Sequence, residues 1–238
     1  MTFRFFPYKG SKRRLSKRLP ADYFPVIEPF AGSASFATEY ALGKRAILCD
    51  MDPKIAAVWR WLRDDTSEFI ELPDRLVAGT LVSEVMKGFS QPAKDFMRLW
   101  AGGGRGMDNK VQNRADGGLH PMHGVWEART RGLLNDQRKQ IAQWEILCSS
   151  YRDVPNQTAT WFIDPPYHGR KYYRYNALDT DKFICFVLER RGLSITTVGD
   201  SRIVIPGAEL LELERTTGVT RTNKERFTER IYIRKNYA

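Results

Sequence analysis

The order of elements between residues 26 and 62 constrains the fold more than any other part of the sequence. The apolar run 26–31 ends in a series of small residues, as a strand does where it enters a tight turn. Helical spacing follows, and a second apolar run comes at 45–49. Asp52 and Pro53 then supply the cap and the first residue of another helix. This alternation of strand and helix is typical of an α/β protein with a parallel sheet.

The same pattern returns after residue 140, and a segment of different composition separates the two halves. Residues 87–139 contain nine of the 18 glycines and show no strand-type alternation. We therefore expect one sheet domain interrupted by an inserted, loop-rich and mostly helical lobe. The expected elements of the sheet domain are strand 26–31, helix 36–42, strand 45–49, a helix from 53 to 62, strands 144–148 and 160–163, helix 181–191, and strands 193–198, 208–213 and 230–234.

Composition excludes several classes of protein. The chain has 238 residues, of which 42% are hydrophobic, which is enough to form a core and excludes global disorder. No apolar run approaches the roughly 20 residues of a membrane span, and the basic N-terminus has no apolar stretch of the signal-peptide type. The three cysteines lie far apart, which excludes a disulfide framework and a cysteine-based zinc site. We expect a cytoplasmic protein.

Positive charge is concentrated in two places. The net charge is +10, with seven basic and no acidic residues in 1–20, and ten basic and five acidic residues in 87–139. Such a balance favours a polyanionic partner, namely DNA, RNA or an anionic membrane surface. The less favoured alternative is a solvated surface without a partner.

The turn after the first strand has the features of a ligand site. In open α/β sheets, ligands bind beyond the carboxyl ends of the strands. Gly32 allows a ligand to approach backbone N–H groups there, and Asp50, eighteen residues later, can accept both hydroxyls of a ribose. The chain has neither G-x-G-x-x-G nor a following G-K-S/T, which disfavours a dinucleotide and a P-loop nucleotide. The pair indicates an adenosine-containing ligand, with a plain strand–helix turn as the alternative.

A sharper motif follows the strand expected at 160–163, where the sequence reads Asp164-Pro165-Pro166-Tyr167. The two prolines hold the backbone extended and carry no N–H, so this loop presents chiefly acceptors. Acceptors are what an exocyclic amino group requires, and Tyr167 offers a flat face on which a base can stack.

These motifs together resemble those of a known family. Glu-Pro-Phe-Ala-Gly-Ser at 28–33, followed by Asp-Pro-Pro-Tyr at 164–167, is similar to the Dam-type (class alpha) adenine-N6 DNA methyltransferases of bacteria and phages. The segment 8–12 is similar to the aromatic-x-Gly-Gly-Lys segment of that family, with Ser11 in place of a glycine, and 226–234 resembles its closing strand. The resemblance covers residues 3–62 and 141–238, and the insertion only poorly.

The resemblance implies an S-adenosylmethionine-dependent (SAM-dependent), Rossmann-like mixed sheet with helices on both faces. Residues 1–62 and 141–238 would form this catalytic domain, and 63–140 an inserted target-recognition region. The cofactor would be SAM, with S-adenosylhomocysteine as its product and no metal. Asp164, Pro165, Pro166 and Tyr167 would be catalytic, with Asp164 beside the sulfonium and facing the base. The implied cofactor-binding residues are Tyr8, Lys12, Phe30, Gly32, Ser33, Asp50, Ser150 and Asp164.

One departure from the family pattern affects the cofactor site. Similar enzymes carry an acidic residue after the strand that corresponds to 144–148, where it contacts the adenine of the cofactor. Here the sequence reads Ser149-Ser150-Tyr151. A serine hydroxyl still forms a hydrogen bond, so we expect weaker cofactor binding rather than none.

The resemblance also implies double-stranded DNA as the partner, with the target base flipped out of the helix. We expect no membrane partner, a monomer or weak dimer, and a role in a phage or in restriction and modification. The alternatives are a cytosine-N4 or RNA-adenine methyltransferase and a catalytically silent DNA-binding protein of the same fold. In similar enzymes, aspartate at the start of the Pro-Pro-Tyr motif favours adenine over cytosine. Candidate DNA contacts are Lys9, Arg13, Arg98, Arg105, Lys110, Arg114, Arg129, Arg131, Lys171 and Arg174.

Two other patterns have structural explanations. His120 and His123 are half of a metal site at most, because a proline lies between them and no strong third ligand is near, so a pair of loop histidines is preferred. The Asp50-Met-Asp52 sequence resembles a metal-binding D-x-D, but Asp52 before Pro53 is better explained as a helix cap.

Overall fold

The computed structural model describes residues 3–8, 10–64, 67–77, 79–102, 126–166, 178–199, 202–220 and 223–236, and only the backbone at 214–220 and 223–227. Its strands are β1 (Val26–Glu28), β2 (Ala46–Cys49), β3 (Trp144–Leu147), β4 (Ala159–Ile163), β5 (Gly192–Val198), β6 (Glu209–Thr220) and β7 (Asn223–Asn236). Its helices are α1 (Arg13–Ser16), α2 (Ser35–Tyr40), α3 (Pro53–Asp64), α4 (Ser67–Ile70), α5 (Val82–Val85), α6 (Gln91–Ala101), α7 (Ala128–Arg138) and α8 (Thr180–Glu189), with short 3-10 helices at Lys139–Ile141 and Tyr151–Asp153.

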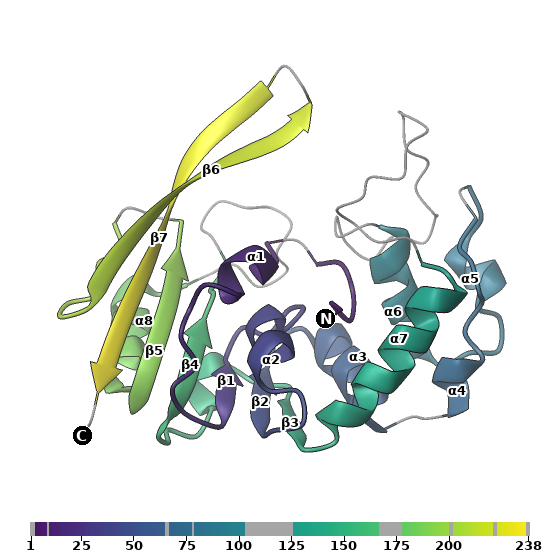
Figure 1. The fold of residues 1–238 in the computed structure, drawn as a ribbon, viewed down its shortest axis with the longest axis horizontal. Helices are drawn as coiled ribbons and strands as arrows, with labels where there is room; N and C mark the ends of the chain where they lie inside the picture. Colours follow the sequence, from purple (N-terminus) through teal and green to yellow (C-terminus); the bar gives the residue numbers. More distant parts are fainter. Residues whose placement is uncertain are drawn as a thin grey trace.

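One seven-stranded sheet runs through the molecule in the order β3-β2-β1-β4-β5-β7-β6 (Figure 1). The first five strands of this order are parallel, and β7 pairs antiparallel with both β5 and β6. From β1 the chain builds outward to β2 and β3, and it then returns to place β4 on the other side of β1. The gap between β1 and β4 is therefore the topological switch point, where ligands bind in open α/β sheets.

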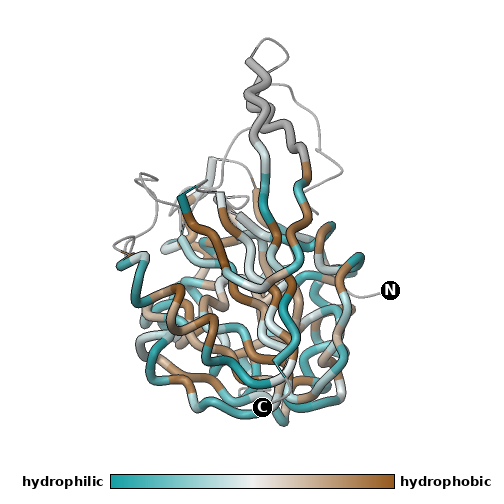
Figure 2. Tube along the Cα trace, turned by 90° about the vertical axis from the view of Figure 1, so that its left-hand side faces the viewer, coloured by the Kyte–Doolittle hydropathy of each residue, from teal (hydrophilic) through white to brown (hydrophobic). Residues whose placement is uncertain are grey.

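Neighbouring residues of each strand point to opposite faces of the sheet, and helices cover both faces. On one face, Phe162 belongs to a core that includes residues of α1, α2, α3 and α6, and its ring stacks on Phe36 of α2 with centroids 4.8 Å apart. On the other face, Trp161 packs with Phe183 and Phe186 of α8. Apolar segments accordingly recur through the interior in Figure 2. This arrangement confirms the expected mixed sheet with helices on both faces.

The described elements between α3 and β3 are the helices α4 to α7, and they lie at the β3 end of the sheet, opposite the β6–β7 hairpin (Figure 1). Trp126 donates from Nε1 to the carbonyl of Pro73 at 2.7 Å, which ties the segment before α7 to the segment after α4. Phe96 of α6 packs on Trp61 of α3 and joins the core of the sheet domain. The division at 63–140 remains a prediction.

Several boundaries differ from those expected. β1 ends at Glu28 rather than 31, because Pro29 has no N–H for the ladder. The last two strands are longer than expected, and their pairing continues beyond Leu213 as a two-stranded hairpin past the end of β5. The extension is rich in threonines and charged residues, and its apolar residues do not alternate. The sequence therefore shows no strand-type periodicity there.

Candidate active site

Three acidic residues lie at the carboxyl ends of the central strands. Glu28 is the last residue of β1, Asp50 follows β2, and Asp164 follows β4. Because these strands are parallel and adjacent, the acids share one edge of the sheet on both sides of the switch point. The sequence analysis predicted this position for Asp50 and Asp164.

The turn after β1 is held in a left-handed conformation at Gly32, whose φ is +46°. A Cβ there would lie 2.8 Å from Cε1 of the Tyr8 ring, so a side chain does not fit. Gly32 donates its N–H to Oδ2 of Asp50 at 2.9 Å, and its carbonyl accepts from Nε1 of Trp59 at 2.8 Å. The structure thus brings together Tyr8, Gly32 and Asp50, three of the predicted cofactor residues.

The Asp50 carboxylate is held by backbone donors. Besides the Gly32 bond, its Oδ1 accepts the N–H of Asp52 at 2.9 Å. Burial raises the pKa of Asp50 to about 6, and the two backbone hydrogen bonds partly offset that rise by favouring the charged form. Each carboxylate oxygen has two lone pairs, so both can accept a further hydrogen bond from a ligand hydroxyl. Asp52 also accepts the Lys54 N–H at 3.0 Å, as expected of a helix cap.

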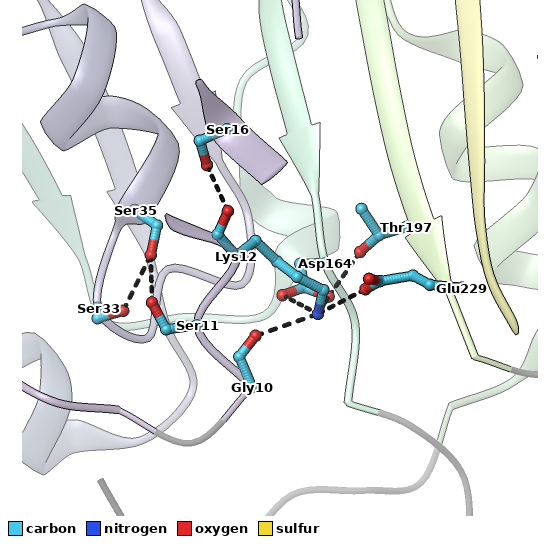
Figure 3. Close-up of polar contacts among 9 residues, drawn as sticks. All are labelled: Gly10, Ser11, Lys12, Ser16, Ser33, Ser35, Asp164, Thr197 and Glu229. Carbon is cyan, nitrogen blue, oxygen red and sulfur yellow. Dashed lines mark hydrogen bonds and ion pairs between the residues drawn. The ribbon is translucent and has the colours of Figure 1, made fainter. Parts of the chain in front are cut away.

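Asp164 is engaged by a lysine from the start of the chain (Figure 3). Lys12 lies just before α1, and its ammonium contacts Oδ1 of Asp164 at 2.8 Å and Oδ2 at 2.9 Å. The same ammonium donates to the carbonyl of Gly10 at 3.1 Å. Lys12 is 4% exposed, whereas the Asp164 side chain is 19% exposed. The acidic group at the end of β4 is therefore charge-compensated and still reached by solvent.

Two further residues complete this cluster, and the sequence analysis assigned a role to neither. Glu229 of β7 places Oε1 3.2 Å from the Lys12 ammonium and is 1% exposed. Thr197 of β5 donates its hydroxyl to Oδ1 of Asp164 at 2.6 Å. Glu229 was part of the strand that resembled the family, which was the only available signal for it. Thr197 lies inside an apolar strand and had none.

Glu28 is a third residue that the sequence analysis left without a role. Its Oε1 accepts the N–H of Ala37 at 2.6 Å, so the carboxyl group satisfies a donor in the first turn of α2. Burial, with a smaller contribution from the charge of Asp164, raises the pKa of Glu28 to about 8. Its place in the Glu-Pro-Phe-Ala-Gly-Ser sequence was the available signal.

The remaining predicted cofactor residues lie around the same edge. Phe30 is partly buried and packs on Tyr151, with ring centroids 5.0 Å apart. Ser33 is buried, and its hydroxyl is 3.2 Å from that of Ser35 (Figure 3). Ser150, just after β3, caps the 3-10 helix at Tyr151–Asp153 by accepting the Arg152 N–H at 3.4 Å. That bond uses one lone pair and leaves the hydroxyl proton of Ser150 available to a ligand.

The predicted catalytic and DNA-contacting residues are described only in part. Pro165 is buried and Pro166 half-buried, and Arg13 on α1 is half-buried. On α7, Arg129 is exposed, and Arg131 contacts Asp74 at 2.6 Å. Arg98 of α6 pairs with Asp95 at 2.8 Å. Their contact with DNA remains a prediction. Outside the described residues lie Lys9, Arg105, Lys110, Arg114, Tyr167, Lys171 and Arg174, as well as His120 and His123.

Two kinds of feature are absent from the described residues. In that part of the chain, no group of three or more His, Cys, Asp or Glu residues is placed to hold a metal ion. None of the helices described there is long and apolar enough to cross a membrane.

The sheet order, the antiparallel β7 between β5 and β6, and the acids at the switch point define the Rossmann-like fold of the SAM-dependent methyltransferases. Residues 8–97 match the model of one family, the D12 class N6 adenine-specific DNA methyltransferases. The match includes Tyr8, Lys12, the Gly32 turn and Asp50, and it confirms the resemblance to adenine-N6 DNA methyltransferases drawn from the sequence.

Other comparisons add less. No curated protein matches the sequence. Among solved structures, a protein from Pyrococcus horikoshii described as a candidate RNA methyltransferase aligns at 9% identity over 95% of this chain and 78% of that chain, with a TM-score of 0.36. This likeness is too distant to bear on function.

Proposed function

We propose that the chain is a site-specific DNA methyltransferase that moves a methyl group from SAM to the exocyclic N6 of an adenine flipped out of duplex DNA. The match of residues 8–97 to an adenine-specific family supports the substrate. The observation that carries the proposal is the position of Asp164: it follows β4 at the switch point, is partly exposed, and already has a nitrogen donor, the Lys12 ammonium, on both of its oxygens.

The residues at the edge of the sheet fit SAM. Its sulfonium is positively charged and suits a site with the carboxylate of Asp164, and its ribose hydroxyls suit the acceptors of Asp50. The absence of a side chain at Gly32 lets the Tyr8 ring pack against this turn, beside the Asp50 carboxylate that Gly32 holds. SAM supplies an activated methyl group, so the residues of the chain have mainly to position the reacting atoms. The residues that would hold it are Tyr8, Lys12, Phe30, Gly32, Ser33, Asp50, Ser150 and Asp164.

The acceptors at the end of β4 would act on the nucleophile. The amino nitrogen of adenine is a weak nucleophile because its lone pair is delocalised into the ring. Hydrogen bonds from the amino group to Asp164 and to the Pro165 carbonyl favour tetrahedral nitrogen, and they strengthen as that nitrogen gains positive charge. SAM would supply the methyl group; the amino nitrogen that gained it would have to lose one proton, and Asp164 would accept that proton.

The target base must leave the duplex to reach Asp164. Tyr167 would stack on the flipped adenine, and the basic residues of α1, α6 and α7 would contact phosphates. Each phosphate contact releases counterions, so DNA affinity should fall steeply as salt concentration rises. Among the described candidates, Arg98 and Arg131 would have to exchange a carboxylate for a phosphate.

The test is transfer of a labelled methyl group from SAM to duplex DNA, followed by mass analysis of the nucleosides. We expect N6-methyladenine. We expect Asp164→Ala to reduce the rate by at least about 1,000-fold while DNA binding stays within about twofold. Asp64→Ala is the control, because Asp64 is an exposed acid paired with its neighbour Arg63.

Other outcomes identify the alternatives. N4-methylcytosine, or methylated RNA without methylated DNA, would replace the proposed substrate. DNA binding without any methyl transfer would make the chain a silent protein of this fold. Turnover of Asp164→Ala at the wild-type rate would remove Asp164 from its central role.

A further inference from the structure

The Asp164 carboxylate is held from two sides, and the two sides are not equivalent. Strand pairing places Ile163 of β4 opposite Thr196 of β5, so Asp164 lies level with Thr197. Thr197 is fully buried, and its hydroxyl crosses from β5 to donate to Oδ1 of Asp164 at 2.6 Å (Figure 3). Lys12 approaches separately and reaches both oxygens.

Counting donors distinguishes the two oxygens of Asp164. Each carboxylate oxygen accepts about two hydrogen bonds. From the described residues, Oδ1 accepts two, one from Thr197 and one from Lys12, whereas Oδ2 accepts one, from Lys12. Oδ2 is therefore the oxygen with capacity for another donor.

The Thr197 bond also determines the orientation of the carboxylate. Rotation of the Asp164 carboxylate would move Oδ1 away from the Thr197 hydroxyl and would leave that buried hydroxyl without its acceptor, which is unfavourable. Glu229 restrains the other side by holding the Lys12 ammonium at 3.2 Å.

We propose that Thr197 is a positioning residue for methyl transfer: it occupies Oδ1 of Asp164 and so directs Oδ2 to the incoming amino group. This inference rests on the proposed function. Thr197 does not touch the reacting atoms in this scheme and acts entirely through Asp164. Its loss should lower the rate of the chemical step and leave the binding of SAM and DNA almost unchanged.

The neighbouring Thr196 provides a matched control. It lies on the same strand, is equally buried, and its Oγ1 has no hydrogen-bond partner among the described residues. Thr196→Val and Thr197→Val therefore make the same isosteric change in the same strand, but only the second removes a donor to Asp164. Thr197→Ser keeps the hydroxyl, and Thr197→Ala removes it without adding a methyl group in its place.

The experiment measures single-turnover methylation of duplex DNA, the Kd values of SAM and DNA, and Tm for these variants. We expect Thr197→Val and Thr197→Ala to methylate about 10- to 100-fold more slowly than the wild type, with both Kd values within about twofold. Thr197→Ser should stay within about threefold of the wild type, and Thr196→Val should match it.

The outcomes separate the two proposals. If the wild type methylates adenine and Thr197→Val reacts as fast as Thr196→Val, the positioning role is wrong and the proposed function stands. A slow Thr197→Ser with a normal Tm would also overturn the positioning role, because the hydroxyl would not be what matters. If the wild type transfers no methyl group to DNA, the proposed function itself fails. Should Thr197→Val unfold, Thr197→Ala gives the same comparison.

Discussion

The two sides of the switch point hold their acids in different ways. Asp50, after β2, is held by the backbone N–H groups of Gly32 and Asp52, which are 18 and 2 positions away. Asp164, after β4, is held by the side chains of Lys12 and Thr197, which are 152 and 33 positions away. A backbone N–H is present whatever residue carries it, whereas one substitution removes a side-chain donor. The β4–β5–β7 side should therefore be much the more sensitive to mutation.

The largest difference is expected at Glu229. Glu229→Gln keeps the size of the side chain but removes one of the two carboxylate charges that contact the buried Lys12 ammonium, so a charge-assisted contact that holds Lys12 in place becomes a weaker one. We expect the methylation rate to fall about 10- to 100-fold and Tm to fall as well. The matched control is Glu212→Gln, since Glu212 forms an exposed ion pair with Arg230 on the β6–β7 hairpin.

If Glu229→Gln methylates DNA as fast as Glu212→Gln, the contrast between the two acids is wrong, because Asp164 would then function without the side chain that holds Lys12. A fall in Tm without a fall in the rate per folded molecule would reduce Glu229 to a structural role.

A smaller effect is expected at Asp50. Asp50→Asn replaces one acceptor oxygen by an NH₂ group, which would face a backbone N–H donor. We expect the Kd of SAM to rise about tenfold while the maximal rate changes little. Asp52→Asn is the control, because asparagine also caps helices.

The pH dependence of SAM binding sharpens this prediction. Because burial raises the pKa of Asp50 to about 6, its carboxyl group takes up a proton as the pH falls through that value. The protonated group is a poorer acceptor, so SAM affinity of the wild type should weaken from about pH 7 to about pH 5. Titration calorimetry should find this trend absent in Asp50→Asn. The same trend in both proteins would assign the titration to another group.

The smallest effect is expected at Ser150. Its hydroxyl already accepts the Arg152 N–H as a cap, so Ser150→Ala removes both that cap and the donor that we propose for the cofactor. We expect the Kd of SAM to rise about threefold and the stability to fall by about 0.5–1 kcal/mol. If titration finds the same Kd of SAM for Ser150→Ala and the wild type, Ser150 does not belong to the cofactor site.

The same contrast explains what the sequence predicted. Asp50 and Gly32 stand in one strand–turn–helix–strand unit, so their meeting follows from the local pattern. Asp164 was predicted because it precedes two prolines at the end of an apolar strand, which is an uncommon sequence. Thr197 could not be predicted, because a threonine inside an apolar strand is ordinary, and its importance depends on the register between β4 and β5.

The strands of the sheet also differ in how well the sequence predicted them. Strand and helix alternation predicted β1, β2, β4 and β5 to within a few residues. The outer half of the β6–β7 hairpin was missed because its sequence has no apolar alternation, whereas the structure shows it as pairing between its own two strands. Hydrophobic periodicity detects only elements that bury one face, so it does not detect a hairpin made of polar residues.

The contact between Lys12 and Glu229 has a consequence for how the protein folds. Lys12 precedes β1 in the chain, whereas Glu229 lies on β7. A folding chain that has paired β1 with β4 can bring Lys12 to Asp164, but the contact of Lys12 with Glu229 forms only once β7 has closed the sheet beside β5. The cluster around Asp164 is therefore complete only when the antiparallel end of the sheet has formed, which couples this site to the folding of β7.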